Sequence, residues 1–133
     1  MSGVGPATWL AIAGGAVLGA WGRWLLGLAL NRAGQPMPWG TLAANVAGGL
    51  LIGAALALFE RRPELGAAWR PFFVTGFLGA LTTFSTFSAE VMTLLQQGRW
   101  GLAAGAAGLH LAGSLLATAA GLATLGALKP AGG

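Results

Sequence analysis

Hydrophobic residues run along this chain in four long segments, which short polar stretches separate. The apolar segments cover Ala7–Leu30, Thr41–Phe59, Phe72–Leu95 and Leu102–Leu128. Each is close to the ~20 residues that cross about 30 Å of hydrocarbon as an α-helix. The pattern therefore predicts an all-α integral membrane protein, a single domain over residues 1–133 with four transmembrane helices.

The segments between the apolar runs carry turn residues and membrane-interface residues. Residues 31–38 hold a glycine and two prolines, which cannot continue a helix, and residues 60–71 and 96–101 hold most of the arginines. Amphipathic indoles favour the membrane interface. Four tryptophans lie at or near the ends of the predicted spans: Trp9, Trp39, Trp69 and Trp100.

The composition supports a lipid-facing surface and excludes several classes of protein. Charged residues make up 8% of the chain, whereas a soluble domain carries about a quarter. The net charge of +4 comes from scattered cations, so no nucleic-acid partner is expected. One histidine, with no aspartate and no cysteine, leaves no catalytic triad and no paired-histidine metal site, so we expect no enzyme.

The charges at the span ends leave the orientation in the membrane open. Four spans put both termini on one side, and the loop and tail on that side carry only slightly more cations than the opposite loops. The cations on the first side are Arg61, Arg62, Arg70 and Lys129, and those on the other are Arg32 and Arg99, with Arg23 if it extends outward. Both a single topology with cytoplasmic termini and insertion in two orientations fit this weak bias.

Twenty-four glycines predict close helix packing and a partner subunit. Gly15 and Gly19 form a small-xxx-small pair in the first span, and Gly49 and Gly53 form another in the second. Four helices packed this closely leave little room for a pore inside one subunit. A conducting path is therefore expected along an interface with a second copy, and a dimer is the commonest closed assembly.

The third span contains a stretch that predicts an interrupted helix. Gly76 and Gly79 precede Thr82 and Thr83 near the middle of the span. A break would free carbonyls and amides that lipid cannot satisfy, so it should be buried in protein or line an ion site. The alternative is a continuous helix whose threonines bond back to their own carbonyls.

The polar residues in the spans are rich in donors and poor in acids. Asn45, Arg23 and many hydroxyls accompany one carboxylate, Glu90, whereas a cation path would use several carboxylates. Such a lining suits a small anion, to which the positive edges of phenylalanine rings can contribute. His110, Ser114 and Thr118 repeat at i+4 as a polar stripe on the fourth span, although hydroxyls and rings also serve packing.

Three motifs of the chain resemble the CrcB/Fluc family of fluoride channels. They are Gly-x-x-x-Gly-Ala-x-x-Arg ending at Arg23, Gly-Thr-Leu-x-x-Asn-x-x-Gly over 40–48, and Gly-Phe-Leu-Gly-Ala-Leu-Thr-Thr-Phe-Ser-Thr-Phe-Ser-x-Glu over 76–90. The resemblance covers all four spans, and the last motif is highly specific. It implies a channel that exports fluoride from the cytoplasm across the inner membrane and so relieves fluoride toxicity.

The resemblance also implies an antiparallel, dual-topology homodimer with two fluoride paths, a third helix broken at mid-membrane and a central structural sodium ion. Gly79 and Thr82 correspond to the sodium ligands, through their backbone carbonyls. The fluoride-pore candidates are Asn45, Phe84, Phe87, Thr41, Ser85, Ser88, Ser114, Arg23 and Glu90. The fourth span departs from the family: Ala106 stands where many relatives carry tyrosine, and His110 where a small hydroxyl is common.

Two other functions fit parts of the pattern. A small four-helix, proton-coupled multidrug exporter would carry a buried glutamate in its first span, but the ionisable group there is Arg23. A non-conducting assembly protein would not need Asn45 or the polar cluster over residues 82–88.

Overall fold

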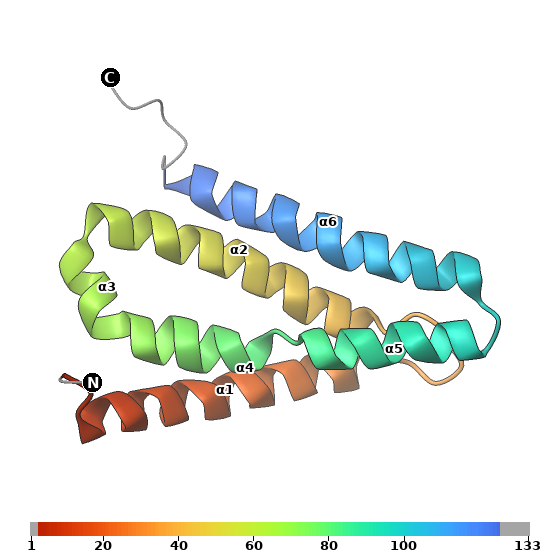
Figure 1. The fold of residues 1–133 in the computed structure, drawn as a ribbon, viewed down its shortest axis with the longest axis horizontal. Helices are drawn as coiled ribbons and strands as arrows, with labels where there is room; N and C mark the ends of the chain where they lie inside the picture. Colours follow the sequence, from red (N-terminus) through yellow and green to blue (C-terminus); the bar gives the residue numbers. More distant parts are fainter. Residues whose placement is uncertain (1–2, 126–133) are drawn as a thin grey trace.

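The computed structural model describes residues 3–125, which fold into helices joined by short connections (Figure 1). The helical elements are α1 (Pro6–Leu30), α2 (Trp39–Arg61), α3 (Pro63–Arg70), the π-helix η1 (Pro71–Leu78), α4 (Gly79–Leu81), α5 (Phe84–Gln96) and α6 (Trp100–Thr124). α1, α2, α6 and the consecutive elements η1, α4 and α5 lie roughly side by side along the long axis of the molecule, and α3 turns across one end.

The prediction of four membrane-spanning helical segments is confirmed. Helices long and apolar enough to cross a membrane cover Pro6–Leu30, Trp39–Arg61, Pro63–Gln96 and Trp100–Thr124. The predicted fourth span extends to residue 128, and its residues 126–128 lie outside the described residues. The same holds for Lys129, which was counted among the cations at the span ends.

The connection predicted over residues 60–71 is largely helical instead. Arg62 departs from helical geometry and separates α2 from α3, and Figure 1 shows the chain turning there towards η1. Pro63 and Pro71 lie in the first turns of α3 and η1, where a missing N–H costs little. The prolines therefore begin helices, and the guanidinium of Arg70 lies 5.6 Å from the ring centre of Phe59 across the bend.

Glycines form the two main seams between helices. A Cβ at Gly15 or Gly19 of α1 would collide with the backbone of η1, and one at Gly53 of α2 or Gly121 of α6 would collide with the backbone of the opposite helix. The predicted close packing is thus present within the chain, where it joins α1 to η1 and α2 to α6.

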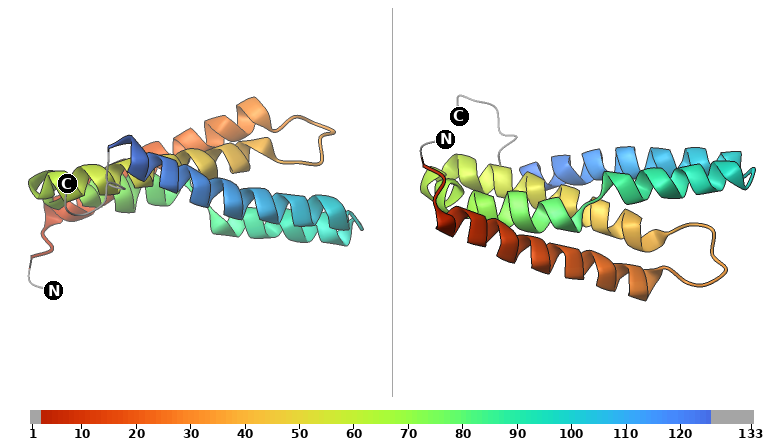
Figure 2. Two further views of the ribbon diagram at one scale, coloured as in Figure 1. Left: turned by 90° about the horizontal axis from the view of Figure 1, so that it is seen from above. Right: turned by 60° about the horizontal axis from the view of Figure 1, so that its bottom comes forward.

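Two extended residues interrupt the third span. Thr82 (φ −87°, ψ 155°) and Thr83 (φ −151°, ψ 124°) separate α4 from α5. The Thr82 hydroxyl donates to the Leu78 carbonyl at 2.9 Å. The helix interruption and the threonine-to-carbonyl hydrogen bond, which the sequence offered as alternatives, are therefore both present. The span also changes partners here, since η1 and α4 pack on α1 whereas α5 packs on α6 (Figure 2).

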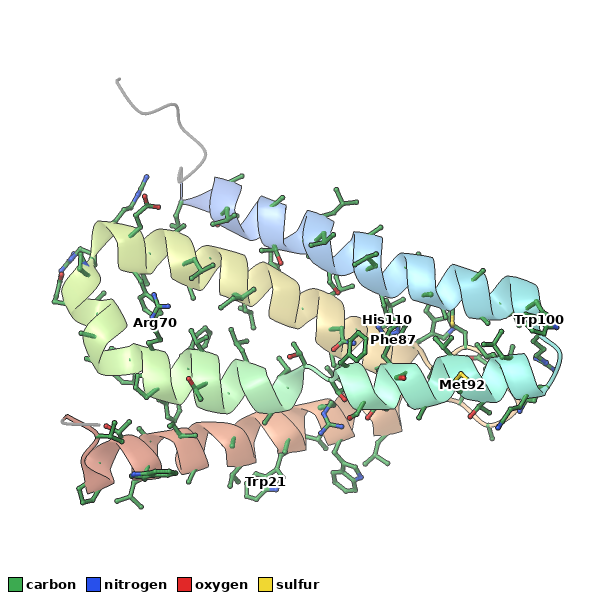
Figure 3. All side chains as sticks on the ribbon, in the orientation of Figure 1. Trp21, Arg70, Phe87, Met92, Trp100 and His110 are labelled. Carbon is green, nitrogen blue, oxygen red and sulfur yellow. The ribbon has the colours of Figure 1, made fainter. Side chains whose placement is uncertain are left out.

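Large apolar side chains cover the outside of the bundle. Trp21 points away from the other helices on the outer face of α1 (Figure 3) and is 62% exposed. Leu111, Leu115 and Leu116 of α6 are similarly exposed. An apolar exterior of this extent fits contact with lipid.

A matched pair of glycines on α6 tests the seam between α2 and α6. Gly121→Ala should lower the free energy of unfolding in detergent by about 1–3 kcal/mol, because the new methyl meets the backbone of α2. Nothing lies within 4 Å of a Cβ at Gly105, so Gly105→Ala should leave the free energy of unfolding unchanged or raise it by up to about 1 kcal/mol, because alanine has the higher helix propensity. Equal effects of the two substitutions would contradict the described packing.

Candidate functional site

A groove of about 510 Å³ lies beside the interruption, between α2, η1, α4, α5 and α6. It brings together six of the residues predicted for the pore or the cation site: Asn45, Gly79, Thr82, Phe84, Phe87 and Ser114. Residues from three of the four predicted spans thus meet at one place.

The amide of Asn45 binds the backbone of Thr83 from both sides. Its Oδ1 accepts from the Thr83 N–H at 2.8 Å, and its Nδ2 donates to the Thr83 carbonyl at 3.0 Å. We call these two hydrogen bonds the Asn45–Thr83 clamp. They give an extended residue the partners that a helix would otherwise supply, and a buried backbone group requires such partners.

The clamp and the hydroxyl of Thr83 change the bonding of the predicted sodium ligands. In a continuous helix the carbonyl of Gly79 would accept from the N–H of Thr83, which here donates to Asn45. The carbonyl of Thr82 would accept from the N–H of Thr86, which here donates to the Thr83 hydroxyl at 3.1 Å. Both carbonyls therefore lose their regular helical donors.

The same residues begin α5 with its amino end beside the groove. Thr83 caps the helix through its hydroxyl, which also lies 3.3 Å from the Ser85 hydroxyl. Phe84 is 79% exposed and meets Phe87 edge to face, with ring centres 5.5 Å apart. The amino end of a helix is partially positive, and so are ring edges, so this end of the groove favours negative charge.

Two predicted pore residues meet outside the groove. The Thr41 hydroxyl donates to Glu90 Oε1 at 2.6 Å, and Glu90 Oε2 is buried without a hydrogen-bond partner among the described residues. Glu90 lines a separate cavity of about 370 Å³, together with Arg32 and Gln35 of the α1–α2 loop.

The remaining candidates are not among the residues that line the groove. Arg23 donates through Nε to the Ala80 carbonyl at 3.0 Å, which ties α1 to α4. Ser85 and Ser88 lie exposed on α5. The groove therefore gathers six residues of the predicted set, and the other five lie outside its lining.

Two further residues of the site, Thr83 and His110, were named in the sequence analysis without a predicted role. Thr83 supplies the backbone that Asn45 binds, although only its neighbour Thr82 was assigned a ligand role. His110 is buried, and its Nδ1 lies 3.0 Å from Asn45 Nδ2. The i+4 repeat with Ser114 signalled that His110 faces the site, but it could not indicate which groups His110 contacts.

The chain is similar to a family of known proteins over nearly its whole length. Residues 10–122 match the family described as "CrcB-like protein, Camphor Resistance (CrcB)". The match includes every residue of the groove.

Individual relatives carry a functional name. A protein of Chromohalobacter salexigens named "Fluoride-specific ion channel FluC" is 57% identical over 124 residues, covering 93% of this chain and 94% of that protein. Proteins of the same name from Bordetella avium and Pseudomonas paraeruginosa are each 59% identical, over 119 and 113 residues. These cover 90% and 85% of this chain, and 93% and 89% of the relatives.

Replacement of Asn45 tests the clamp. Asn45→Leu leaves the N–H and C=O of Thr83 without these partners, so it should lower the free energy of unfolding in detergent by roughly 2–4 kcal/mol. Thr93→Val removes a hydroxyl that bonds within its own helix at an exposed position, and should change stability by less than about 0.5 kcal/mol. A similar small change for Asn45→Leu would show that the clamp is dispensable.

Proposed function

The chain belongs to the CrcB family, and from this membership we propose that it is a fluoride-selective channel of the inner membrane. It exports fluoride from the cytoplasm and thereby relieves fluoride toxicity. The observation that carries the proposal is the groove, where hydroxyls, ring edges and a helix amino end converge without a carboxylate in the lining.

The chemistry of the groove suits a small anion that leaves water. Such an ion needs hydrogen-bond donors and positive dipoles in place of its hydration shell. Asn45, Phe84, Phe87 and Ser114 line the groove and are the proposed pore residues. Asn45 acts here by shaping the wall through the clamp, because its amide already bonds Thr83 and His110. Thr41 and Glu90, which lie together by the second cavity, would contribute at a mouth of the path.

The exposed side of the groove supports a homodimer. Phe84 is large and apolar, yet 79% of its surface is uncovered beside polar groups. A second copy seated on this face would cover Phe84 and close the groove into a path. Ser85, Ser88 and Arg23 would reach the path only through such an interface.

An antiparallel arrangement places the two interruptions together. A two-fold axis in the membrane plane relates copies of opposite orientation, and an interruption at mid-membrane would lie beside its counterpart at that axis. The weak charge bias of the sequence permits both orientations.

A structural sodium ion fits the same axis. The carbonyls of Gly79 and Thr82 lack their regular helical donors, because Asn45 and Thr83 take the amides of Thr83 and Thr86. Two copies would offer four such oxygens, and neutral carbonyls are hard ligands that suit an alkali cation. When bound, the ion would supply positive charge at the centre of the dimer.

Liposome efflux tests the proposed activity. Vesicles loaded with potassium fluoride and supplied with a potassium ionophore should release fluoride to an electrode only when they contain the protein, while chloride-loaded vesicles should hold their anion. Phe84→Ile should slow fluoride efflux about tenfold or more, because the positive ring edge is lost.

The aromatic control is Phe72, which contacts Trp69 edge to face and does not line the groove. Phe72→Ile should conduct fluoride like the wild type. Failure of the wild-type protein to release fluoride, or equal release of chloride, would contradict the proposed function.

Cysteine labelling tests the proposed assembly. The chain has no cysteine, so Gln35→Cys and Ala67→Cys each introduce a unique thiol, in connections at opposite ends of the spans. Dual topology predicts that a membrane-impermeant maleimide labels about half of the copies at each position in intact cells. Both changes leave the cation count, and hence the orientation bias, unaltered.

Full labelling at one position with none at the other would show a single topology and contradict the antiparallel dimer. In the same preparations, exchange of sodium for N-methylglucamine should weaken the dimer on gel filtration. A dimer that is indifferent to sodium would contradict the proposed ion site.

A further inference from the structure

His110 lies between two of the proposed pore residues. It is 6% exposed on α6, its Nδ1 lies 3.0 Å from Asn45 Nδ2, and its ring centre is 4.5 Å from that of Phe87. Figure 3 shows His110 and Phe87 next to each other, between α6 and α5. The imidazole therefore touches the polar and the aromatic part of the groove at once.

The direction of the hydrogen bond between Asn45 and His110 follows from the clamp. Thr83 fixes the orientation of the Asn45 side-chain amide, because the Thr83 N–H requires the amide oxygen and the Thr83 carbonyl requires the NH₂ group. One hydrogen of Nδ2 goes to the Thr83 carbonyl, which leaves the other for His110. Nδ1 of His110 must therefore accept, so the ring is neutral and carries its proton on Nε2.

We infer that His110 is a positioning residue of the conduction path: its Nδ1 accepts the second Asn45 N–H and so locks the amide that holds Thr83 extended. This inference rests on the proposed function for its effect on fluoride. His110 does not need to touch the ion for this role, because it acts through Asn45. All the polar atoms of the Asn45 amide are then engaged within the subunit.

The role differs from that of a packing ring. Contact with Phe87 needs only an aromatic or apolar side chain, whereas the Asn45 N–H needs an acceptor at the position of Nδ1. An asparagine places Oδ1 the same number of bonds from the backbone as histidine Nδ1, but offers no ring. A phenylalanine offers the ring without the acceptor. These two replacements separate hydrogen bonding from packing.

Nitrogen NMR of the wild-type protein tests the assigned tautomer directly. His110 is the only histidine of the chain, so ¹⁵N-histidine labelling gives a single imidazole. In lipid nanodiscs at neutral pH, Nδ1 should show the shift of an unprotonated nitrogen and Nε2 that of a protonated one. A protonated Nδ1 would overturn the inference, whatever the protein conducts.

Efflux from vesicles tests the consequence for fluoride. His110→Phe should slow release about tenfold, the order expected when one buried donor loses its acceptor. His110→Asn should restore at least about half of the wild-type rate. Both variants are compared after gel filtration as folded protein, and His110→Leu replaces His110→Phe if the larger ring prevents folding.

The positioning role would be overturned if His110→Phe released fluoride at the wild-type rate. It would also be overturned if His110→Asn released fluoride as slowly as His110→Phe. The two claims fail differently. A wild-type protein that releases no fluoride contradicts the proposed function, while the NMR experiment still decides whether His110 accepts from Asn45.

Discussion

Two hydrogen bonds between the Asn45 amide and the backbone of Thr83 constrain the rest of the site. They stabilise an extended residue inside an apolar span, where lipid offers no partner for a free N–H or C=O. Together with the Thr83 hydroxyl, which caps α5, they determine where α4 ends, where α5 begins and which carbonyls are deprived of helical donors. The proposed cation ligands and the proposed anion path thus both depend on the extended conformation of Thr83.

The glycine seams hold this arrangement in place. α2 carries Asn45 and packs closely along α6, which carries His110, because Gly53 and Gly121 let the backbones approach. On the other side, Gly15 and Gly19 fix η1 against α1, and Arg23 binds the Ala80 carbonyl just before the interruption. The third span can then change partners at Thr82–Thr83, and the groove lies where it does so.

The sequence predicted what depends on segment length and local composition. The lengths of the four apolar segments predicted the spans, and the glycine pairs predicted where helices pack closely. Both patterns are set by the lipid that surrounds the helices. Residues 60–71 were predicted as a connection between spans, whereas they contain helix α3, and Pro63 and Pro71 stand where helices begin. The resemblance also grouped Glu90 with Phe84 and Phe87 as pore candidates, whereas the Glu90 carboxylate accepts from Thr41 and lines a separate cavity. Spacing defines a helical face but not the neighbour that the face meets.

Amide hydrogen exchange at Thr83 tests the central claim most directly, because it reports on the N–H that Asn45 binds. We expect slow exchange in the wild-type protein and much faster exchange at Thr83 in Asn45→Leu, with the amides of α6 unchanged. Equal exchange at Thr83 in the two proteins would contradict the account.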